Sequence, residues 1–323
     1  MKRVLVTGAS GFVGSHLLDL LLDDIDCSEC EVHGTMRYRS NLDNIKHNIG
    51  KDCLKLHTCD YTDQKSVDEL IKEVNPHKIF HLAAHSFVPD SFHMPHYMLD
   101  NVKMTLNILE SVKTHAPNCK VHIAGSSEEY GMVEASECPI DETQPLRPMS
   151  QYGVSKIACE YLAFQYQTTY NIKVIVTRSF NHTGPRRNSR FVCSHFAREL
   201  ALMNMGKKAY SIEHGNLDAI RDYTDVRDIV RAYWDLSELE EEIKYPINLC
   251  SGKGHKIEEV LNMLQSMSGI SPQRNWVESR MRPSDVPLLV GSSEKAKMLI
   301  GWKPEINFKK TLEDLYDYWL ENV

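Results

Sequence analysis

One short stretch near the N-terminus decides the fold: Val4-Leu5-Val6-Thr7-Gly8-Ala9-Ser10-Gly11-Phe12-Val13-Gly14. Its pattern is typical of a buried strand, a glycine-rich turn and the first turn of a helix. Gly8 allows the tight turn, Gly11 lets the backbone approach a pyrophosphate, and Gly14 lets helix and strand pack closely. Backbone N–H groups and the helix dipole then favour a negatively charged ligand, so the stretch predicts a dinucleotide site. We expect the cofactor to contact Gly8, Ser10, Gly11, Phe12 and Val13.

Short β-rich runs alternate with helical patterns over the first half of the chain. The runs expected to form strands are Arg3–Thr7, Glu31–Met36, Cys53–His57, Lys78–Leu82, Lys120–Ala124 and Lys173–Thr177. Between two of them, Ser66–Val74 places Val67, Leu70 and Ile71 on one face of a helix. Strands separated by helices pair in parallel through right-handed crossovers. The sequence therefore predicts an α/β fold, a Rossmann-type doubly wound parallel sheet.

The alternation breaks down beyond about residue 180, where Pro, Gly, Arg and aromatic residues gather in loops. We expect residues 1–180 to form the dinucleotide-binding domain and residues 181–323 to form mainly a smaller substrate-binding lobe. About residues 222–250 are expected to return to the large domain, through a helix over Asp228–Leu236 and a strand over Pro246–Cys250.

Composition excludes several classes of function. The 323 residues carry a formal net charge of −7, which argues against a large basic surface that binds nucleic acid. No stretch approaches the roughly 20 apolar residues that span a bilayer, so we expect no membrane association. A strand-like segment begins at once at Arg3, so no signal peptide is expected and the location is interpreted as cytoplasmic.

Nine cysteines are scattered along the chain. This odd count does not indicate a disulfide framework, and most are interpreted as buried thiols in a reducing compartment. Cys27 and Cys30 form a lone CxxC without the second pair that a zinc site needs. We therefore expect no metal site.

The residues after the second strand bear on the choice of cofactor. An NAD site usually has an acidic residue there to hold the ribose 2′-hydroxyl. This chain has Arg37 and Arg39 instead, and two guanidiniums suit a 2′-phosphate. NADP is therefore favoured, although NAD binding and a merely solvated basic loop stay open. Asp60 is expected to accept from the adenine amino group or to cap the following helix, and further cofactor contacts are expected from Tyr61, Leu82, Ala83 and Ala84.

Tyr152 and Lys156 form a Tyr-x-x-x-Lys pair. Residues four apart on a helix share a face. A nearby ammonium stabilises the tyrosinate and lowers the pKa of the phenol toward working pH. Tyr152 can then exchange a proton with a sugar hydroxyl while hydride moves to or from the cofactor, with Lys156 as a further cofactor contact.

A polar turn, Ser126-Ser127-Glu128-Glu129-Tyr130-Gly131, follows the fifth strand, whose carboxyl end should face the cofactor. A hydroxyl of Ser126 or Ser127 can orient the reacting 4-hydroxyl. The carboxylate of Glu128 can act as a general base on a neighbouring carbon. One of the two adjacent glutamates is interpreted as a loop charge.

Four further segments carry a resemblance over essentially the whole chain. They are Phe180-Asn181-His182-Thr183-Gly184-Pro185-Arg186-Arg187, Gly215-Asn216-Leu217-Asp218-Ala219-Ile220-Arg221-Asp222, Arg282-Pro283-Ser284-Asp285-Val286 and Gly301-Trp302-Lys303-Pro304. With these, the chain resembles sugar-nucleotide-modifying extended short-chain dehydrogenases/reductases. It is most similar to GDP-mannose 4,6-dehydratases and GDP-4-keto-6-deoxymannose reductases.

The resemblance implies a GDP-linked sugar as substrate. It implies that Asn181, Arg221 and Arg282 bind the diphosphate and Asp285 the nucleotide ribose. Further substrate contacts are expected from Ser86, Arg187 and Val192. In similar enzymes, helices like those around His96–Lys113 and Gln151–Tyr170 pair across a two-fold axis, so a homodimer or homotetramer is expected.

Some segments of the chain resemble the dehydratases and others resemble the reductases. Arg37 and Arg39 and the Pro185–Arg187 turn resemble the dehydratases, whereas Gly125–Gly131 and Leu146–Ser150 resemble the reductases at least as much. Dehydratases commonly have Thr where this chain has Ser126. Because Glu128 stands where elimination needs an extra base, we interpret the chain as a 4,6-dehydratase of GDP-mannose or GDP-N-acetylglucosamine. The alternatives are an NADPH-dependent 4-keto reductase, an epimerase and a catalytically silent nucleotide sensor.

Overall fold

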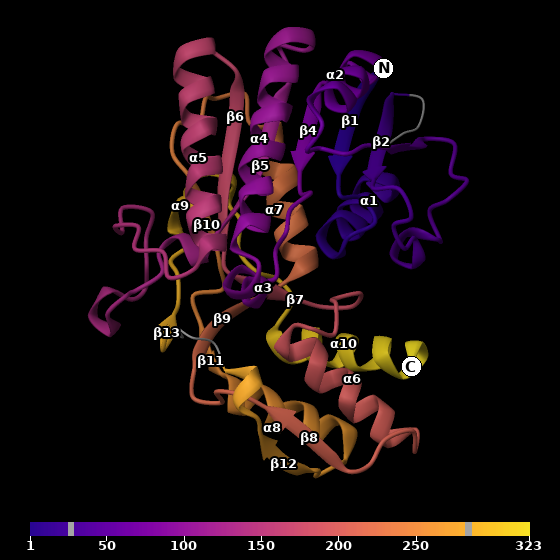
Figure 1. The fold of residues 1–323 in the computed structure, drawn as a ribbon, viewed down its shortest axis with the longest axis vertical. Coiled ribbons are helices and arrows are strands. Elements are labelled where there is room, and N and C mark those ends of the chain that lie inside the picture. The colour runs from indigo at the N-terminus through magenta and orange to yellow at the C-terminus, as the bar shows by residue number, and fades with distance from the viewer. Residues whose placement is uncertain (25–28, 282–285) are drawn as a thin grey trace. The chain divides into compact units, whose positions relative to one another are not determined.

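The computed structural model describes residues 1–24, 29–281 and 286–323. The chain divides into two compact units (Figure 1). The first unit comprises Met1–Glu129, Ser150–Ser179 and Val230–Ile247. The second comprises Tyr130–Met149, Phe180–Ile229 and Asn248–Val323.

A seven-stranded sheet forms the centre of the first unit, in the order β10-β6-β5-β4-β1-β2-β3. Its strands are β1 (Lys2–Thr7), β2 (Cys30–Met36), β3 (Leu54–Thr58), β4 (Lys78–His81), β5 (Lys120–Ser126), β6 (Lys173–Ser179) and β10 (Ile247–Leu249). Within this order, each pair of adjacent strands from β6 to β3 is parallel. The predicted doubly wound sheet is confirmed. Its strand order reverses between β1 and β4, where open α/β sheets bind their ligands.

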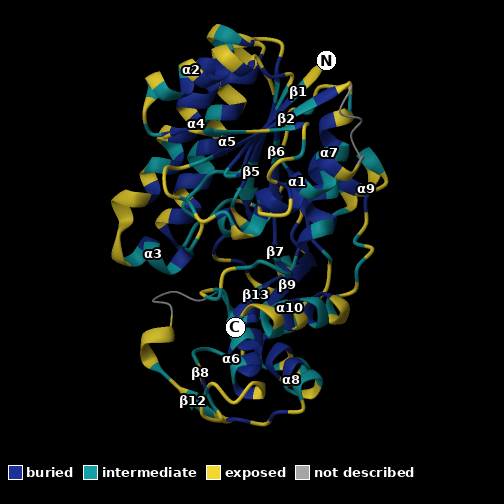
Figure 2. Cartoon of the chain, turned by 90° about the vertical axis from the view of Figure 1, so that its right-hand side faces the viewer, coloured by how far each residue is buried: buried dark blue, intermediate teal, exposed yellow. Residues whose placement is uncertain are grey.

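Helices cover both faces of this sheet. They are α1 (Phe12–Asp24), α2 (Gln64–Val74), α4 (Pro95–His115), α5 (Gln151–Tyr170) and α7 (Val226–Glu238), and the short helix α3 (Val88–His93) packs on α4 and α5. On one face α2, α4 and α5 bury Val67, Ile108 and Ala163 against Val121. On the other face lie α1 and α7 (Figure 2), and Trp234 of α7 packs on Phe80. The sheet is thereby buried on both faces, as a parallel sheet requires.

The second unit is a smaller α+β assembly. Its strands are β7 (Asn181–Thr183), β8 (Ser211–His214), β9 (Ile220–Asp225), β11 (Gly254–Lys256), β12 (Gln273–Trp276) and β13 (Leu288–Leu289). The strand β9 is central, with β11, β13 and β7 as neighbours, and β12 pairs with β8. The helices are α6 (Val192–Asn204), α8 (Ile257–Ser268), α9 (Glu294–Ile300) and α10 (Phe308–Asn322). Of these, α6, α8 and α10 share one apolar core that contains Leu200, Leu261 and Leu315.

One of the motifs behind the resemblance has a structural role. The indole of Trp302 is buried and donates to the carbonyl of Asp228 at 3.0 Å. The Asp228 carboxylate accepts from the backbone N–H groups of Glu305 and Ile306. The Gly301–Pro304 segment therefore fixes the chain before α10 to the start of α7.

Most cysteines are buried thiols, as predicted. The free cysteines among the described residues are Cys30, Cys59, Cys119, Cys138, Cys159, Cys193 and Cys250, of which only Cys138 is not buried. Cys53, in contrast, is disulfide-bonded, which the sequence did not predict. None of the described helices is long and apolar enough to cross a bilayer.

Candidate active site

The glycine-rich turn joins β1 to α1 at the point where the strand order reverses. Gly8 has φ +66°, in the left-handed region, and a Cβ there would lie 3.1 Å from the backbone of Ala83. A Cβ on Gly14 would lie 2.3 Å from the carbonyl oxygen of Gly8. Neither position tolerates a side chain without a backbone shift, so the turn presents bare backbone. Such a turn at a helix N-terminus fits the pyrophosphate of a dinucleotide.

A buried threonine holds the neighbouring loop against this turn. The hydroxyl of Thr7 accepts from the backbone N–H groups of Leu82 and Ala83, both at 2.9 Å, and lies 3.1 Å from Nδ1 of His81. Because both acceptor positions are used, the hydroxyl hydrogen donates to Nδ1, which leaves the imidazole proton on Nε2. Burial lowers the pKa of His81 to about 3, so the ring stays neutral. Thr7 and His81 thereby fix the loop that begins Leu82-Ala83-Ala84.

The basic loop after β2 is exposed, as a phosphate site requires. Arg37 and Arg39 are both exposed, and the guanidinium of Arg39 lies 5.3 Å from the ring centroid of Tyr38. Arg39 has φ +63°, a left-handed conformation that is uncommon for a side chain of this size. These two guanidiniums are free to turn toward an anionic ligand.

Asp60 and Tyr61, after β3, have different surroundings. The carboxylate of Asp60 accepts from the N–H and hydroxyl of Thr62, and these bonds lower the pKa of Asp60. Asp60 does not cap the helix that follows, because Asp63 is the N-cap of α2. The phenol of Tyr61 is buried and hydrogen-bonds Thr35 at 2.8 Å. Only the backbone of Tyr61 can therefore lie near a cofactor.

Helix α5 carries the Tyr-Lys pair. Its N-cap, Ser150, accepts from the N–H of Gly153 and fixes the first turn, which contains Tyr152. One turn later, the buried ammonium of Lys156 donates to the carbonyl of Ala124 at 2.7 Å and lies 5.9 Å from the Tyr152 ring centroid. Burial lowers the pKa of Lys156. This pair is thus fixed to β5 two residues before Ser126.

An amide on α4 ties α5 to the loop after β4. The side chain of Asn101 accepts from the N–H of His85 and donates to the His85 carbonyl. The same amide lies 3.1 Å from the hydroxyl of Ser155 on α5. Ser86, expected to contact the substrate, follows His85 directly and is exposed. This role of Asn101 was not predicted from the sequence.

The polar turn after β5 forms a short 3₁₀ helix, η2 (Ser127–Glu129), against which α5 packs. The hydroxyl of Ser126 accepts from the N–H of Glu128 at 3.2 Å. Ser126 and Ser127 are buried and Glu128 is half-buried. Glu129 is fully buried, so the interpretation of one glutamate as a loop charge is wrong for Glu129. The structure thus brings the candidate base and hydroxyls to the helix that carries the Tyr-Lys pair.

The second unit contains the residues expected to bind a sugar diphosphate. Asn181 lies on β7, opposite Tyr223 of β9, and Arg221 is buried on the same strand β9. The guanidinium of Arg187 lies 3.4 Å above the ring of Phe191, beside Val192 at the start of α6. Arg282 and Asp285 lie outside the described residues. Within the described part of the chain, no group of three His, Cys, Asp or Glu side chains is placed to hold a metal ion.

Together, these features define a class of protein. A doubly wound sheet, a bare glycine turn at its switch point and a Tyr-Lys pair beside a Ser-Glu turn characterise nicotinamide-dependent short-chain dehydrogenases/reductases of the extended type. Comparison with protein families narrows the class. The family model described as GDP-mannose 4,6 dehydratase matches residues 5–315, and the chain belongs to that family.

The relatives include both groups named from the sequence. GDP-mannose 4,6 dehydratase 2 of Arabidopsis thaliana is 33% identical over 99% of this chain and 87% of its own length. GDP-6-deoxy-D-mannose reductase of Pseudomonas aeruginosa is 32% identical over 100% of this chain and 98% of its own. Among solved structures, RMD from Pseudomonas aeruginosa complexed with NADPH superimposes with a TM-score of 0.84 and 30% identity, covering 100% of both chains.

Proposed function

We propose that the chain is an NADP-dependent 4,6-dehydratase of a GDP-hexose, with GDP-mannose or GDP-N-acetylglucosamine as substrate. The observation that carries the proposal is the position of Glu128. This carboxylate lies on a turn packed against the helix of Tyr152 and Lys156. A simple keto reduction needs only the Tyr-Lys pair, whereas elimination needs an additional base.

The chain fits NADP at the β1–α1 turn. Gly8, Gly11 and Gly14 leave room for the pyrophosphate, and Arg37 and Arg39 would hold the 2′-phosphate. The relative from Pseudomonas aeruginosa was solved with NADPH, whereas a UDP-glucose 4-epimerase from Thermus thermophilus, 27% identical, was solved with NAD. When bound, the cofactor accepts a hydride from C4 of the sugar and returns it to C6.

The residues then have the following roles. Lys156, next to the phenol, stabilises the tyrosinate of Tyr152, which takes the proton of the sugar 4-hydroxyl. Ser126 and Ser127 orient that hydroxyl. The ketone formed at C4 acidifies the C5 proton, which Glu128 removes and transfers to the departing C6 hydroxyl, so that water leaves. C5 takes up a proton from solvent when the hydride is returned to C6. Because the hydride is returned, the reaction has no net redox change.

The sugar nucleotide is assigned to the second unit. Arg187 and Arg221 would pair with the diphosphate, since guanidiniums bind phosphate oxygens in a bidentate manner. Asn181 and Val192 are the other described residues assigned to the sugar nucleotide. Arg282 and Asp285, which lie outside the described residues, are assigned to it as well. Ser86, in the first unit, would contact the hexose.

A second candidate is a 4-keto reductase, favoured by the 32% identical relative named as a reductase. Incubation with a panel of nucleotide sugars, without added reduced cofactor and with products measured by mass, separates the two. Loss of one water from a GDP-hexose is expected. If instead no sugar nucleotide is dehydrated and NADPH is consumed with a 4-keto sugar, the reductase is the correct function.

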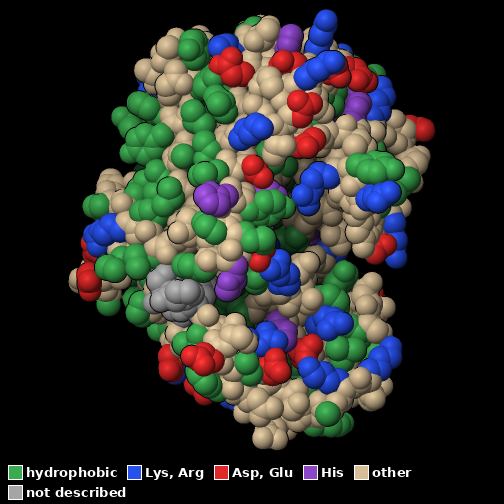
Figure 3. Space-filling model, in the orientation of Figure 1, with side chains coloured by type: hydrophobic (Ala, Val, Ile, Leu, Met, Phe, Trp, Pro, Cys, Tyr) green, Lys and Arg blue, Asp and Glu red, His purple; other side chains and the backbone are tan. Residues whose placement is uncertain are grey.

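The assembly is proposed to be a homodimer or homotetramer formed through α4 and α5. Hydrophobic side chains gather on the α5 side of the first unit in Figure 3. The large exposed ones on these two helices are Tyr97, Leu99, Leu106, Val154, Tyr161, Phe164 and Tyr170. An apolar surface of this kind usually marks an interface. Sedimentation is expected to show at least a dimer, and a monomer at micromolar concentration contradicts the proposal.

A cytoplasmic location is part of the same proposal. Six of the seven described free thiols are buried, which suits a reducing compartment. Cys53 is not one of these free thiols, because it is disulfide-bonded, and it does not support a reducing compartment. Fractionation that places the protein outside the cytoplasm contradicts this proposal.

A further inference from the structure

Three ionisable side chains from three elements meet inside the first unit, next to the catalytic turn. They are Glu129 of η2, Arg178 of β6 and Glu160 of α5, and their side chains are 0%, 4% and 10% exposed. The guanidinium donates twice to Glu160, from Nε at 2.9 Å and from Nη2 at 2.6 Å. The same Nε lies 3.4 Å from Oε2 of Glu129.

This cluster contacts the active site at both ends. At one end, Oε1 of Glu129 accepts from the backbone N–H of Ser126 at 2.7 Å. At the other end, Glu160 lies one helical turn after Lys156, which itself lies one turn after Tyr152. The helix of the Tyr-Lys pair and the turn of the candidate base are therefore joined through Arg178.

The backbone is shaped to admit the Glu129 carboxyl. Gly125 lies opposite Arg178 in the β5–β6 register. A Cβ on Gly125 would lie 2.7 Å from Oε1 of Glu129 and 2.6 Å from the carbonyl oxygen of Thr177. The glycine therefore leaves the space in which Glu129 reaches the N–H of Ser126.

Two carboxyl groups share one guanidinium, and their surroundings differ. Burial raises the pKa of Glu129 well above its usual range, and the charge of Glu160 acts in the same direction. Oε2 of Glu129 accepts no hydrogen bond among the described residues, and a side-chain hydrogen bond between Glu129 and Glu160 also raises the pKa of Glu129. A proton on Oε2 satisfies this contact. Glu129 is therefore the neutral carboxyl group of the cluster.

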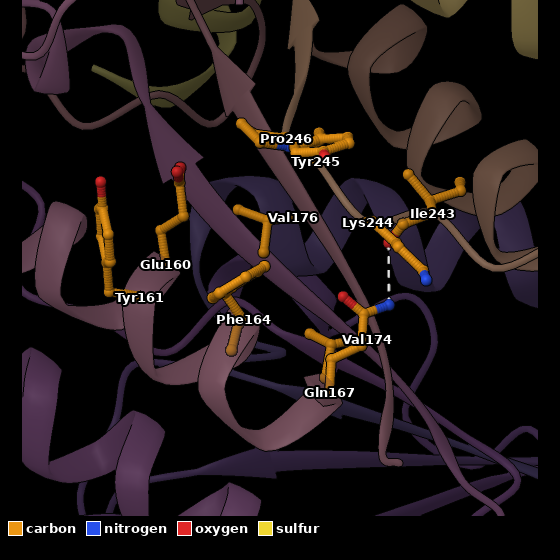
Figure 4. Close-up of a pocket in the computed structure, with 11 residues that line it drawn as sticks. Glu160, Tyr161, Phe164, Gln167, Val174, Val176, Ile243, Lys244, Tyr245 and Pro246 are labelled. Atoms are coloured by element: carbon orange, nitrogen blue, oxygen red, sulfur yellow. Dashed lines mark hydrogen bonds between the residues drawn. The ribbon is translucent and has the colours of Figure 1, made fainter. Parts of the chain in front are cut away.

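The position of Glu160 supports this assignment. Glu160 lies in the wall of a pocket of about 210 Å³, beside Tyr161 and Phe164 (Figure 4). Gln167 of the same helix donates to the carbonyl of Ile243 across the pocket. Water in this pocket can solvate the Glu160 carboxylate, whereas Glu129 has no such access. A charge on Glu129 would therefore have the larger desolvation cost.

We propose that Glu129 is a positioning residue, which holds Ser126 by its backbone and, through Arg178 and Glu160, fixes the Ser126–Glu128 segment relative to Tyr152 and Lys156. For its effect on turnover, the inference rests on the proposed dehydratase function. Displacing a catalytic group by about 1 Å can cost on the order of 10²-fold in rate. A carboxyl group that touches no substrate can thus control the rate through Ser126 and Glu128.

Two substitutions of nearly equal size test the proposal. Glu129→Leu removes the acceptor for the Ser126 N–H, whereas Glu129→Gln retains an oxygen for that bond and a donor toward Glu160. We expect Glu129→Leu to accelerate amide hydrogen exchange at Ser126–Glu128 and to lower kcat by about 10- to 100-fold, with little change in KM. Glu129→Gln should restore both slow exchange and the kcat of wild type.

The pH dependence of kcat/KM distinguishes a positioning role of Glu129 from a role that needs its negative charge. The charged or titratable groups facing Glu129 are Arg178 from β6 and Glu160, Lys156 and Cys159 from α5. If Glu129 is neutral, Glu129→Gln leaves the pH dependence of kcat/KM unchanged. A shifted profile, or a Glu129→Gln variant as slow as Glu129→Leu, overturns the proposal.

Two further measurements keep the test decisive. If Glu129→Leu does not fold, Glu129→Asp replaces it, since it withdraws the carboxyl by one methylene and should accelerate the same exchange. Unchanged exchange in the folded Leu or Asp variant refutes the positioning role. Exchange requires no substrate, so it tests the inference even if wild type dehydrates no GDP-hexose, an outcome that counts against the proposed function alone.

Discussion

The two units differ in how their candidate residues are held. In the first unit, Tyr152, Lys156 and Ser126 are buried; the Lys156 ammonium donates to β5, and the Ser126 N–H donates to Glu129 of η2. In the second unit, Arg187 rests on an aromatic ring in a loop. Rigid placement suits groups that must meet a transition state, whereas a stacked guanidinium suits charge recognition of a phosphate. Substitutions of these buried groups in the first unit should therefore change kcat, and substitutions of the diphosphate-binding candidates in the second unit should change KM.

The largest effect is expected from Tyr152→Phe. The variant lacks the phenol that takes the 4-hydroxyl proton, so the first hydride transfer should stop. We expect kcat to fall toward the upper end of about 10²–10⁴-fold, with no reduced cofactor detected by absorbance. A single-turnover burst of reduced cofactor in this variant would place the proton transfer elsewhere.

Arg221→Met, in the second unit, should change KM instead of kcat. It keeps the volume on β9 and removes one charged donor, and such hydrogen bonds contribute about 1.5–3 kcal/mol. KM for the GDP-hexose should rise by about 10- to 100-fold while kcat changes little. Arg274→Met, in the same unit on β12, is the matched control and should leave KM unchanged. A fall in kcat alone for Arg221→Met contradicts the division of roles.

A double substitution, Arg37→Gln with Arg39→Gln, sharpens the cofactor assignment. Both guanidiniums are exposed, so folding should be unaffected. Equilibrium titration should show weaker NADPH binding by about 10- to 100-fold, the loss expected for a charge-assisted hydrogen bond, with NADH binding unchanged. Wild type that binds NADH at least as tightly as NADPH contradicts the assignment.

The smallest effect concerns stability and pH. Since the folded-state pKa of Glu129 is raised, its proton stabilises the fold fully below the unfolded-state pKa, and this contribution is lost as pH rises through the folded-state pKa. Glutamine does not titrate. The Tm of Glu129→Gln relative to wild type should therefore increase as the pH rises above about 4.5, the ordinary pKa of a glutamate carboxyl group. A difference in Tm that is independent of pH excludes a raised pKa.

Local spacing explains what the sequence could predict. The strand predictions lie within two residues of the observed strands, because periodicity and glycine placement are local properties. The Tyr152 and Lys156 pair could be predicted for the same reason, because residues that are four positions apart lie on the same face of a helix.

The partners that hold the site could not be predicted in this way. Thr7 bonds His81, 74 residues away, and Arg178 joins Glu160 to Glu129 across three elements. The one available sign was a charged residue, Arg178, in an otherwise uncharged part of a buried strand. The phenol of Tyr61 hydrogen-bonds Thr35 in the core, whereas the expected contact of Tyr61 with the cofactor stays a prediction. Such pairings depend on tertiary packing.

The central claim is that Glu128 removes the C5 proton, and solvent-hydrogen exchange at that carbon tests it most directly. Wild type incubated with GDP-mannose in deuterated water should yield a 4-keto-6-deoxy product that carries deuterium at C5. Glu128→Gln is isosteric, so it should fold and bind NADPH as wild type does. Its turnover should fall by about 10²–10⁴-fold, without C5 exchange. Undiminished dehydration with C5 deuterium in the Glu128→Gln product would contradict the account.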